Sequence, residues 1–139
     1  MVEINYWAVL VSAVAAVVVG ALWYGPVFGK FWMSLVGLTT ESMKSMKMSP
    51  FAAMAGGFLG ALFTAFVLAH HLVFANAFLG TTGAESGLMS AFWVWLGFYV
   101  PVTAGSLLWE GKSWKLFALN AAYYLVTLAI SGVILALWV

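Results

Sequence analysis

The chain has 139 residues, of which 65% are hydrophobic, 17% aromatic and only 6% charged. A soluble domain is typically about 25% charged, so this composition excludes a soluble globular protein, and its high apolar content excludes a disordered one. Five lysines against four glutamates, with no arginine, give a net charge of +1, which excludes nucleic acid as a partner because no basic surface can form. The absence of cysteine excludes disulfides and thiolate chemistry. The remaining class is a small integral membrane protein.

Four apolar runs are long enough to cross the hydrocarbon core of a bilayer as helices, which takes about 20 residues each. We expect these spans at residues 5–25, 50–78, 87–109 and 115–139. Their interiors carry no charge and lack the alternating pattern of a β-barrel, so each run satisfies its backbone groups as a helix. The sequence therefore predicts an all-α integral membrane four-helix bundle forming a single domain over residues 1–139.

Residues 27–48, between the first two spans, are expected to contain short helices. Apolar residues recur there at helical spacing and predict a short amphipathic helix lying in the membrane interface; they are Phe28, Phe31, Trp32, Leu35 and Val36. Thr39 or Thr40 is suited to cap a second short helix. Ser49 and Pro50 have the residue types preferred at the start of a helix, here the second span.

The charged residues are distributed unevenly between the two sides of the predicted bundle. The second connection carries Glu85 alone, and every lysine lies in the connections after the first and third spans: Lys30, Lys44, Lys47, Lys112 and Lys115. Positively charged connections stay in the cytoplasm. We therefore expect both termini outside.

Aromatic residues cluster near the ends of the spans. Such residues anchor helices at the two membrane interfaces, and this is the role expected for Tyr6, Trp7 and Trp138 at the outer ends and for Trp23, Tyr24, Phe51, Trp109 and Trp114 at the inner ends.

Two spans carry small residues suited to helix packing. Gly56 and Gly60 form a GxxxG pair, with Thr64 one turn further on, and such pairs let two helix backbones approach closely in lipid. On the third span Gly97 and Pro101 share a face, and Pro101 is expected to kink the helix because it removes a backbone hydrogen bond. We expect these five residues to form contact surfaces.

The fourth span carries a polar stripe of Asn120, Tyr124, Thr127 and Ser131 on one face. One interpretation is packing, with amides and hydroxyls bonding across helix interfaces. The other is a polar path or a small-ligand cavity inside the bundle. No ionisable residue lies at mid-membrane, which argues against an ion-coupled pump.

Candidate metal ligands are few. His71 lies near the outer end of the second span, and Met43, Met46 and Met48 form a run whose thioethers suit Cu(I). A structural zinc site needs more ligands than His71 can gather, and the methionines fit an interfacial helix equally well, so no metal and no cofactor is expected. The glutamates are scattered over both sides of the membrane and no serine has an evident base, so we expect no enzyme.

Motifs in both halves of the chain resemble those of a bacterial membrane family known as domain of unknown function 1761. The first set is Leu22-Trp23-Tyr24-Gly25-Pro26, Phe28-Gly29-Lys30 and Trp32-Met33; the second is Glu110-Gly111-Lys112, Lys115-Leu116-Phe117, Asn120-Ala121, Tyr123 and residues 132–138. The resemblance implies a four-helix inner-membrane protein and supplies no activity or site residues.

These observations favour a non-enzymatic membrane protein that acts by association, as a homo-oligomer or as an accessory subunit of a membrane complex. Its partners would be the lipid bilayer and itself or another membrane subunit. The alternative is a small channel or transporter with a polar path lined by the fourth span.

Overall fold

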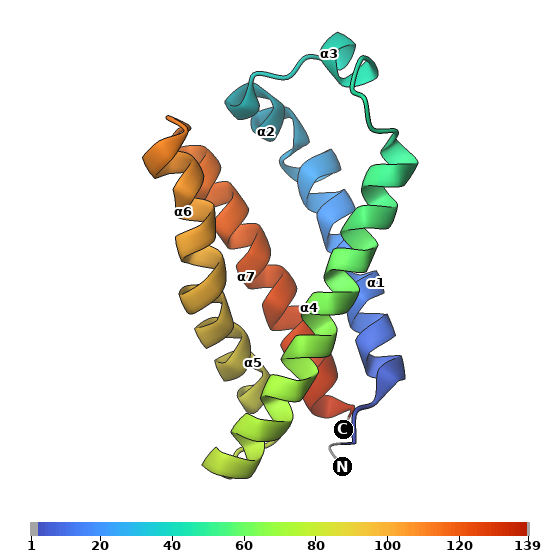
Figure 1. Ribbon diagram of the computed structural model, residues 1–139, viewed down its shortest axis with the longest axis vertical. Helices are drawn as coiled ribbons and strands as arrows, with labels where there is room; N and C mark the ends of the chain where they lie inside the picture. The colour runs from blue at the N-terminus through green and yellow to red at the C-terminus, as the bar shows by residue number, and fades with distance from the viewer. Residues whose placement is uncertain (1–2, 139) are drawn as a thin grey trace.

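The computed structural model describes residues 3–138 and consists of four long helical rods, with two short helices in the first connection and short loops in the other two (Figure 1). Each rod is long and apolar enough to cross a membrane: Tyr6–Val27, Pro50–Leu79, Gly83–Trp109 and Trp114–Leu137. The predicted all-α bundle of four spans is confirmed. The third rod begins one turn earlier than expected, so Glu85 lies in its first turn. The expected end of the fourth span at residue 139 lies outside the described residues.

The first rod consists of α1 (Tyr6–Leu22) and a π-helical turn, η1 (Trp23–Val27). The side chain of Asn5 caps α1, and its Nδ2 donates a hydrogen bond of 2.9 Å to the carbonyl oxygen of Trp138. Both ends of the chain therefore lie at the same end of the bundle (Figure 1). Gly25 leaves helical geometry (φ −107°, ψ −107°), and the chain turns there.

Two short helices then cross the opposite end of the bundle (Figure 1). Helix α2 (Gly29–Val36) ends at Gly37, whose φ of 73° favours glycine. Helix α3 (Thr40–Lys44) is capped by Thr39 through a reciprocal pair of hydrogen bonds with Ser42. The predicted helix between the first two spans is confirmed.

Helix α4 (Pro50–Leu79) begins as predicted, with Ser49 accepting a hydrogen bond from the backbone N–H of Ala52 and with Pro50 at its first position. Only its second half is packed: Ala65, Leu68, Ala69 and Leu72 are buried. Residues 50–57 are exposed on the surface of the chain.

The third rod consists of α5 (Gly83–Val94), a π-helical turn η2 (Trp95–Tyr99) and α6 (Val100–Trp109). Pro101 lies in the first turn of α6, directly after η2. The wide turn before it accommodates the missing N–H. Instead of a simple kink at Pro101, the structure has a π-helical turn that ends two residues before it.

The fourth rod is α7 (Trp114–Leu137), capped by Ser113. It packs most extensively against α5, through glycines that the sequence analysis did not single out. A Cβ added to Gly87 would collide with the carbonyl oxygen of Gly132, and a Cβ on Gly132 would collide with that of Gly87. Ala91 and Ala136 follow these glycines by four residues and touch the opposite one. Two GxxxA motifs therefore pair α5 with α7, the close backbone approach typical of helices in lipid.

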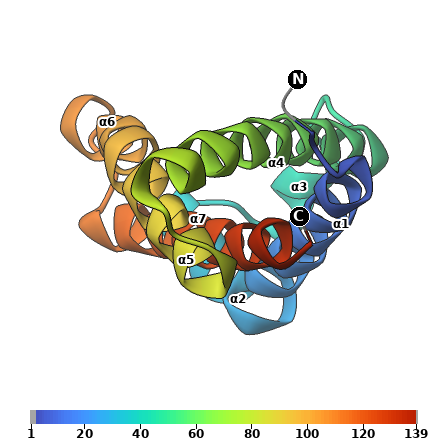
Figure 2. The same ribbon diagram turned by 90° about the horizontal axis from the view of Figure 1, so that it is seen from below.

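The packed core lies in the half of the bundle that holds the termini. Its buried residues come from four helices, which Figure 2 shows end-on from the terminal side, with α4 lying across from α7 and α1. They are Ala8, Val9, Ala65, Leu68, Ala69, Leu72, Ala91, Leu128, Leu135 and Ala136. The other half of the bundle is built differently, and it contains the candidate site.

Candidate functional site

Two adjoining cavities lie between α1, α4 and α7, in the half of the bundle opposite the termini. Their volumes are about 640 and 360 Å³. We refer to the two together as the inner cavity. Five residues line both parts: Ala16, Gly57, Ala61, Tyr123 and Tyr124. No residue of α6 lines the cavity, because α6 packs against α7 and η2 instead. The inner cavity is partly open to its surroundings.

The wall formed by α4 consists largely of small residues. Ala53, Gly57, Gly60 and Ala61 line the cavity from this helix, together with Met54 and Thr64. A Cβ added at Gly57 or Gly60 would meet no atom of the described residues within 4 Å. Between α4 and α7, the space at Gly57 and Gly60 is therefore left open by the small size of these residues.

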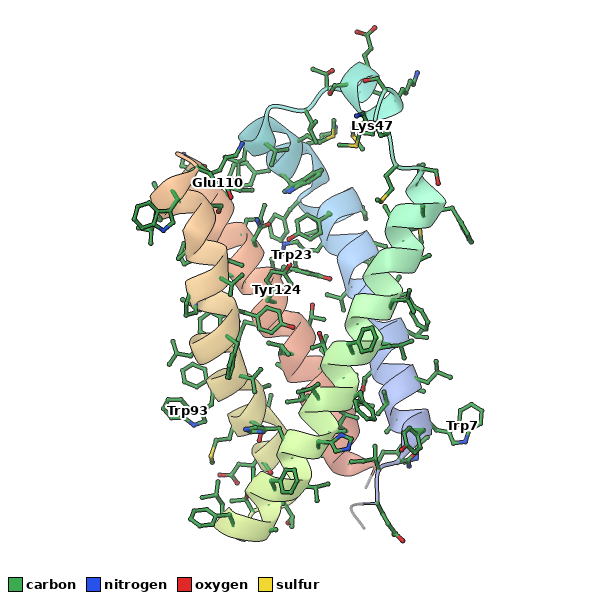
Figure 3. All side chains as sticks on the ribbon, in the orientation of Figure 1. Trp7, Trp23, Lys47, Trp93, Glu110 and Tyr124 are labelled. Atoms are coloured by element: carbon green, nitrogen blue, oxygen red, sulfur yellow. The ribbon has the colours of Figure 1, made fainter. Side chains whose placement is uncertain are left out.

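Four of the five tyrosines of the chain form a continuous cluster on the opposite wall. The ring centroids are 5.0 Å apart for Tyr24 and Tyr123, 5.1 Å for Tyr123 and Tyr124, and 4.7 Å for Tyr124 and Tyr99. These separations are those of favourable aromatic pairs. Figure 3 shows Tyr124 directed from α7 into the space between α7 and α4. We call these four residues the tyrosine cluster.

Hydrogen bonds fix the cluster to three helical rods. The hydroxyl of Tyr24 donates to Oδ1 of Asn120 over 2.8 Å. The hydroxyls of Thr64 and Tyr99 lie 3.1 Å apart and bond to each other. Thr127 donates to the backbone carbonyl of Tyr123, one turn earlier in α7. The polar groups of the cavity lining that have no hydrogen-bond partner among the described residues include the Nδ2 group of Asn120, the hydroxyls of Tyr124 and Ser131, and Nε1 of Trp32.

Helix α2 covers the end of the inner cavity. Trp32 lines the cavity and meets Tyr24 edge-on, with ring centroids 5.6 Å apart. Trp23 packs on Phe28 and Tyr123. Trp23 and Tyr24, predicted as interface anchors, thus pack against other residues of the bundle, and their role at the membrane interface stays a prediction.

The other aromatic residues at the ends of the spans point outward, as interface anchors do. Trp7 is 72% exposed, Phe51 82% and Trp109 87%. Figure 3 shows Trp7 projecting away from the bundle.

The predicted polar stripe of α7 comes together at the inner cavity. Asn120 and Tyr124 line its larger part, and Tyr124, Thr127 and Ser131 line its smaller part. All four face the cavity, and Ser131 is also buried against it. This arrangement matches the cavity interpretation of the stripe more closely than the packing one.

The predicted helix-packing residues separate into two groups. Thr64 contacts Tyr99, and Gly60 lines the inner cavity. Gly56 and Gly97 are exposed, and a Cβ on either would meet no described atom within 4 Å; Pro101 is exposed as well. Gly56 and Gly60 thus form no close helix contact inside this chain, because the first half of α4 diverges from its neighbours. A contact with another chain stays a prediction.

The metal candidates do not form one group. His71 lies 21 residues after Pro50 on α4, roughly 30 Å along the helix axis, whereas Met43, Met46 and Met48 precede that helix. Within residues 3–138, no three His, Asp or Glu side chains come together as metal ligands. The expectation of a protein without metal stays a prediction.

Sequence reasoning missed Tyr99 and Tyr123 as site residues, and it assigned Tyr24 to the interface. The adjacent pair Tyr123-Tyr124 was a usable signal, since it places one hydroxyl on the polar stripe and a second next to it. Tyr99 had no local signal, because only the fold brings it to Thr64 and Tyr124.

Fold and site together define a four-span helical membrane protein with an aromatic-lined cavity in one half of the bundle. Over residues 7–136 the chain matches the family described as Protein of unknown function (DUF1761), and it belongs to that family. The resemblance noted from the sequence motifs is thereby confirmed. No curated protein and no solved structure matches the chain.

Proposed function

We propose that this membrane protein binds a small molecule in the inner cavity and serves as its carrier or receptor, without catalysing a reaction. The observation that carries the proposal is the orientation of the polar stripe. Hydroxyl and amide groups are costly to place in an apolar medium without partners, and here they face a space large enough for a ligand. Ligand pockets typically measure about 300–1,000 Å³, and the larger part of the cavity, at about 640 Å³, lies in this range.

The packed core favours a blind pocket over an open channel. Leu68, Leu72 and Leu128 are each 2% exposed or less, and they belong to the core that fills the terminal half of the bundle. A transport role would therefore need the helices to rearrange.

Two neighbouring glycines of α4 provide a matched test. Gly57 lines both parts of the cavity, Gly56 lines neither, and a side chain at either position has free space. Native mass spectrometry of gently extracted protein should detect a bound small molecule in the wild type and in Gly56→Leu, and a lower occupancy in Gly57→Leu. Equal occupancy in all three proteins would place the molecule elsewhere and contradict the proposal.

A second candidate function is association, as a homo-oligomer or as an accessory subunit of a membrane complex. The observation in its favour is the uncovered first half of α4, where Leu59 and Phe63, on the same face as Gly56, are 55% and 70% exposed. Close approach of a second helix at Gly56 would bury this face.

The association proposal predicts that Gly56→Leu, alone or together with Gly60→Leu, lowers the mass of the detergent-extracted protein or removes a bound partner. Light scattering coupled to size exclusion measures the mass. Gly57→Leu is the control, since it should change the ligand occupancy and leave the mass as it is. An unchanged mass and unchanged partners in the Gly56→Leu protein would reject this interface.

We also propose that the protein lies in a bacterial inner membrane with both termini outside. The lysines support this orientation, because all five belong to segments at the end of the bundle opposite the termini, where Figure 3 labels Lys47.

A further inference from the structure

The lining of the inner cavity carries no ionisable group with a charge at neutral pH. Tyrosine, tryptophan, methionine, asparagine, threonine and serine side chains line it together with aliphatic residues, and no lysine, glutamate or histidine is among them. A charged ligand would lie in a medium of low dielectric constant without a counter-charge, which is unfavourable. The lining therefore selects a neutral molecule.

The unpartnered polar groups of the cavity are hydrogen-bond donors. The Oδ1 atom of Asn120 already accepts the hydroxyl of Tyr24, whereas neither Nδ2 hydrogen of the amide has a partner among the described residues. The hydroxyl of Tyr124 also has a hydrogen to donate. The threonine hydroxyls are occupied, Thr64 with Tyr99 and Thr127 with a backbone carbonyl. A ligand that supplies an acceptor would satisfy the donors of Asn120 and Tyr124.

The two walls of the cavity differ in a way that suits a flat molecule. On one side stand the rings of the tyrosine cluster, and on the other side Gly57 and Ala61 present almost no side chain. Aromatic rings pack favourably on other planar π-systems, and the small residues leave room for such a system to lie beside them.

From charge, donors and shape together, we infer that the inner cavity binds a neutral, planar molecule with carbonyl acceptors, of the kind found in the head group of a quinone. Asn120 and Tyr124 donate hydrogen bonds to a carbonyl oxygen, and the tyrosine cluster packs on the ring. The inference rests on the proposed function and narrows its ligand class. The competing occupant is a lipid acyl chain, which fills apolar space but accepts no hydrogen bond.

Two probes with the same tail separate these occupants. Decyl-benzoquinone carries two carbonyl acceptors, and decylbenzene carries none. Isothermal titration calorimetry of the purified full-length protein in detergent micelles, with empty micelles as the blank, should give an affinity at least about tenfold higher for the quinone, which corresponds to 1.4 kcal/mol.

Variants then test the named donors. Tyr124→Phe keeps the ring and removes the hydroxyl, and Asn120→Leu removes the amide. Each should lower quinone affinity toward that of decylbenzene and leave decylbenzene binding unchanged. Tyr6→Phe, at an exposed tyrosine outside the cavity, is the control and should bind both probes as the wild type does. If Asn120→Leu does not fold, Tyr124→Phe alone decides the role of the hydroxyl.

The outcomes distinguish this inference from the proposed function. Equal affinity for the two probes, or quinone binding that Tyr124→Phe does not weaken, would overturn the carbonyl acceptor and leave a cavity that holds an acyl chain. Failure of both probes to bind would overturn the inference as well. The proposed function would then be judged by its own test, the loss of the co-purified molecule in Gly57→Leu.

Discussion

Tyr24 illustrates how a single side chain in this protein depends on a partner far away in the sequence. By composition and position it resembles every other aromatic residue at the end of a span. Its hydroxyl instead meets Asn120, 96 residues later in the chain. A buried hydroxyl needs such a partner, and Tyr24 and Asn120 line the same cavity. No local pattern reveals which aromatic residue turns inward.

Two buried serines differ in whether the hydroxyl has a hydrogen-bond partner, and so they test how much such a partner contributes to stability. Ser12 is fully buried and its hydroxyl has no partner among the described residues, whereas Ser86 is 2% exposed and bonds to Asn76 and Thr81. Ser86→Ala should lower the free energy of unfolding by about 1–3 kcal/mol, because it leaves buried polar groups unpaired. Ser12→Ala should leave it unchanged or raise it.

Thermal unfolding of the two serine variants in detergent, side by side, measures this difference. A Ser12→Ala protein that loses as much stability as Ser86→Ala would show that the hydroxyl of Ser12 has a partner after all.

At the scale of the elements, α5 and α7 form the closest pair of helices. Their contact requires glycine at two facing positions, because a Cβ at either would strike the backbone of the other helix. The backbone cannot move aside as a flexible side chain can. An added Cβ would therefore push the two helices apart and weaken the packing between them.

Gly87→Ala should therefore destabilise the protein by roughly 1–3 kcal/mol through overpacking. Gly97→Ala, in the same rod, is the control: it adds the same methyl group where no described atom lies within 4 Å. The thermal unfolding temperature should fall for Gly87→Ala alone. Helix propensity favours alanine over glycine, so Gly97→Ala should leave the unfolding temperature unchanged or raise it. A similar fall for both variants would mean that the contact with Gly132 does not set the effect.

The sequence predicted the elements well because their signals are local. The length of the apolar runs defined the four spans, and residue types at the helix starts located the caps at Thr39 and Ser49. The pairing of helices was not predictable in the same way. Gly56 and Gly60 form as good a motif as Gly87 and Ala91, and in lipid no hydrophobic driving force tells two such faces apart.

The site was predicted in part for the same physical reason. The polar stripe of α7 follows from helical periodicity alone, and all four of its members line the cavity. The wall opposite to it depends on where α4 diverges from α7, which is a property of the assembled bundle. Sequence could not show that Gly57 faces the stripe while Gly56 faces away.

At the scale of the whole molecule, the bundle has two unlike halves. The half with the termini is packed by leucine and alanine, and the half with the lysines contains the cavity. Since positive segments remain in the cytoplasm, the proposed orientation places the cavity half of the bundle on that side, beneath α2.

A reporter that is active only in the cytoplasm tests this orientation. Fused after Val139 it should stay silent, and inserted after Gly37, between α2 and α3, it should be active. Activity at Val139 together with silence at Gly37 would invert the orientation.

The division of the bundle into a cavity half and a core half is most directly tested on α4, because this helix contributes residues to both. The chain has no cysteine of its own, so a single introduced cysteine can be labelled specifically. Ala61 lines both parts of the cavity, whereas Ala69, two turns further along, is buried in the core. In Ala61→Cys and Ala69→Cys proteins, the measurement is the rate at which the thiol reacts with N-ethylmaleimide, a small neutral reagent.

We predict fast reaction at position 61 and protection at position 69. Adding Gly57→Leu should slow the reaction at position 61, while adding Gly56→Leu should leave it unchanged. Equal rates at the two positions, or a rate at position 61 that Gly57→Leu does not alter, would contradict the existence of the inner cavity.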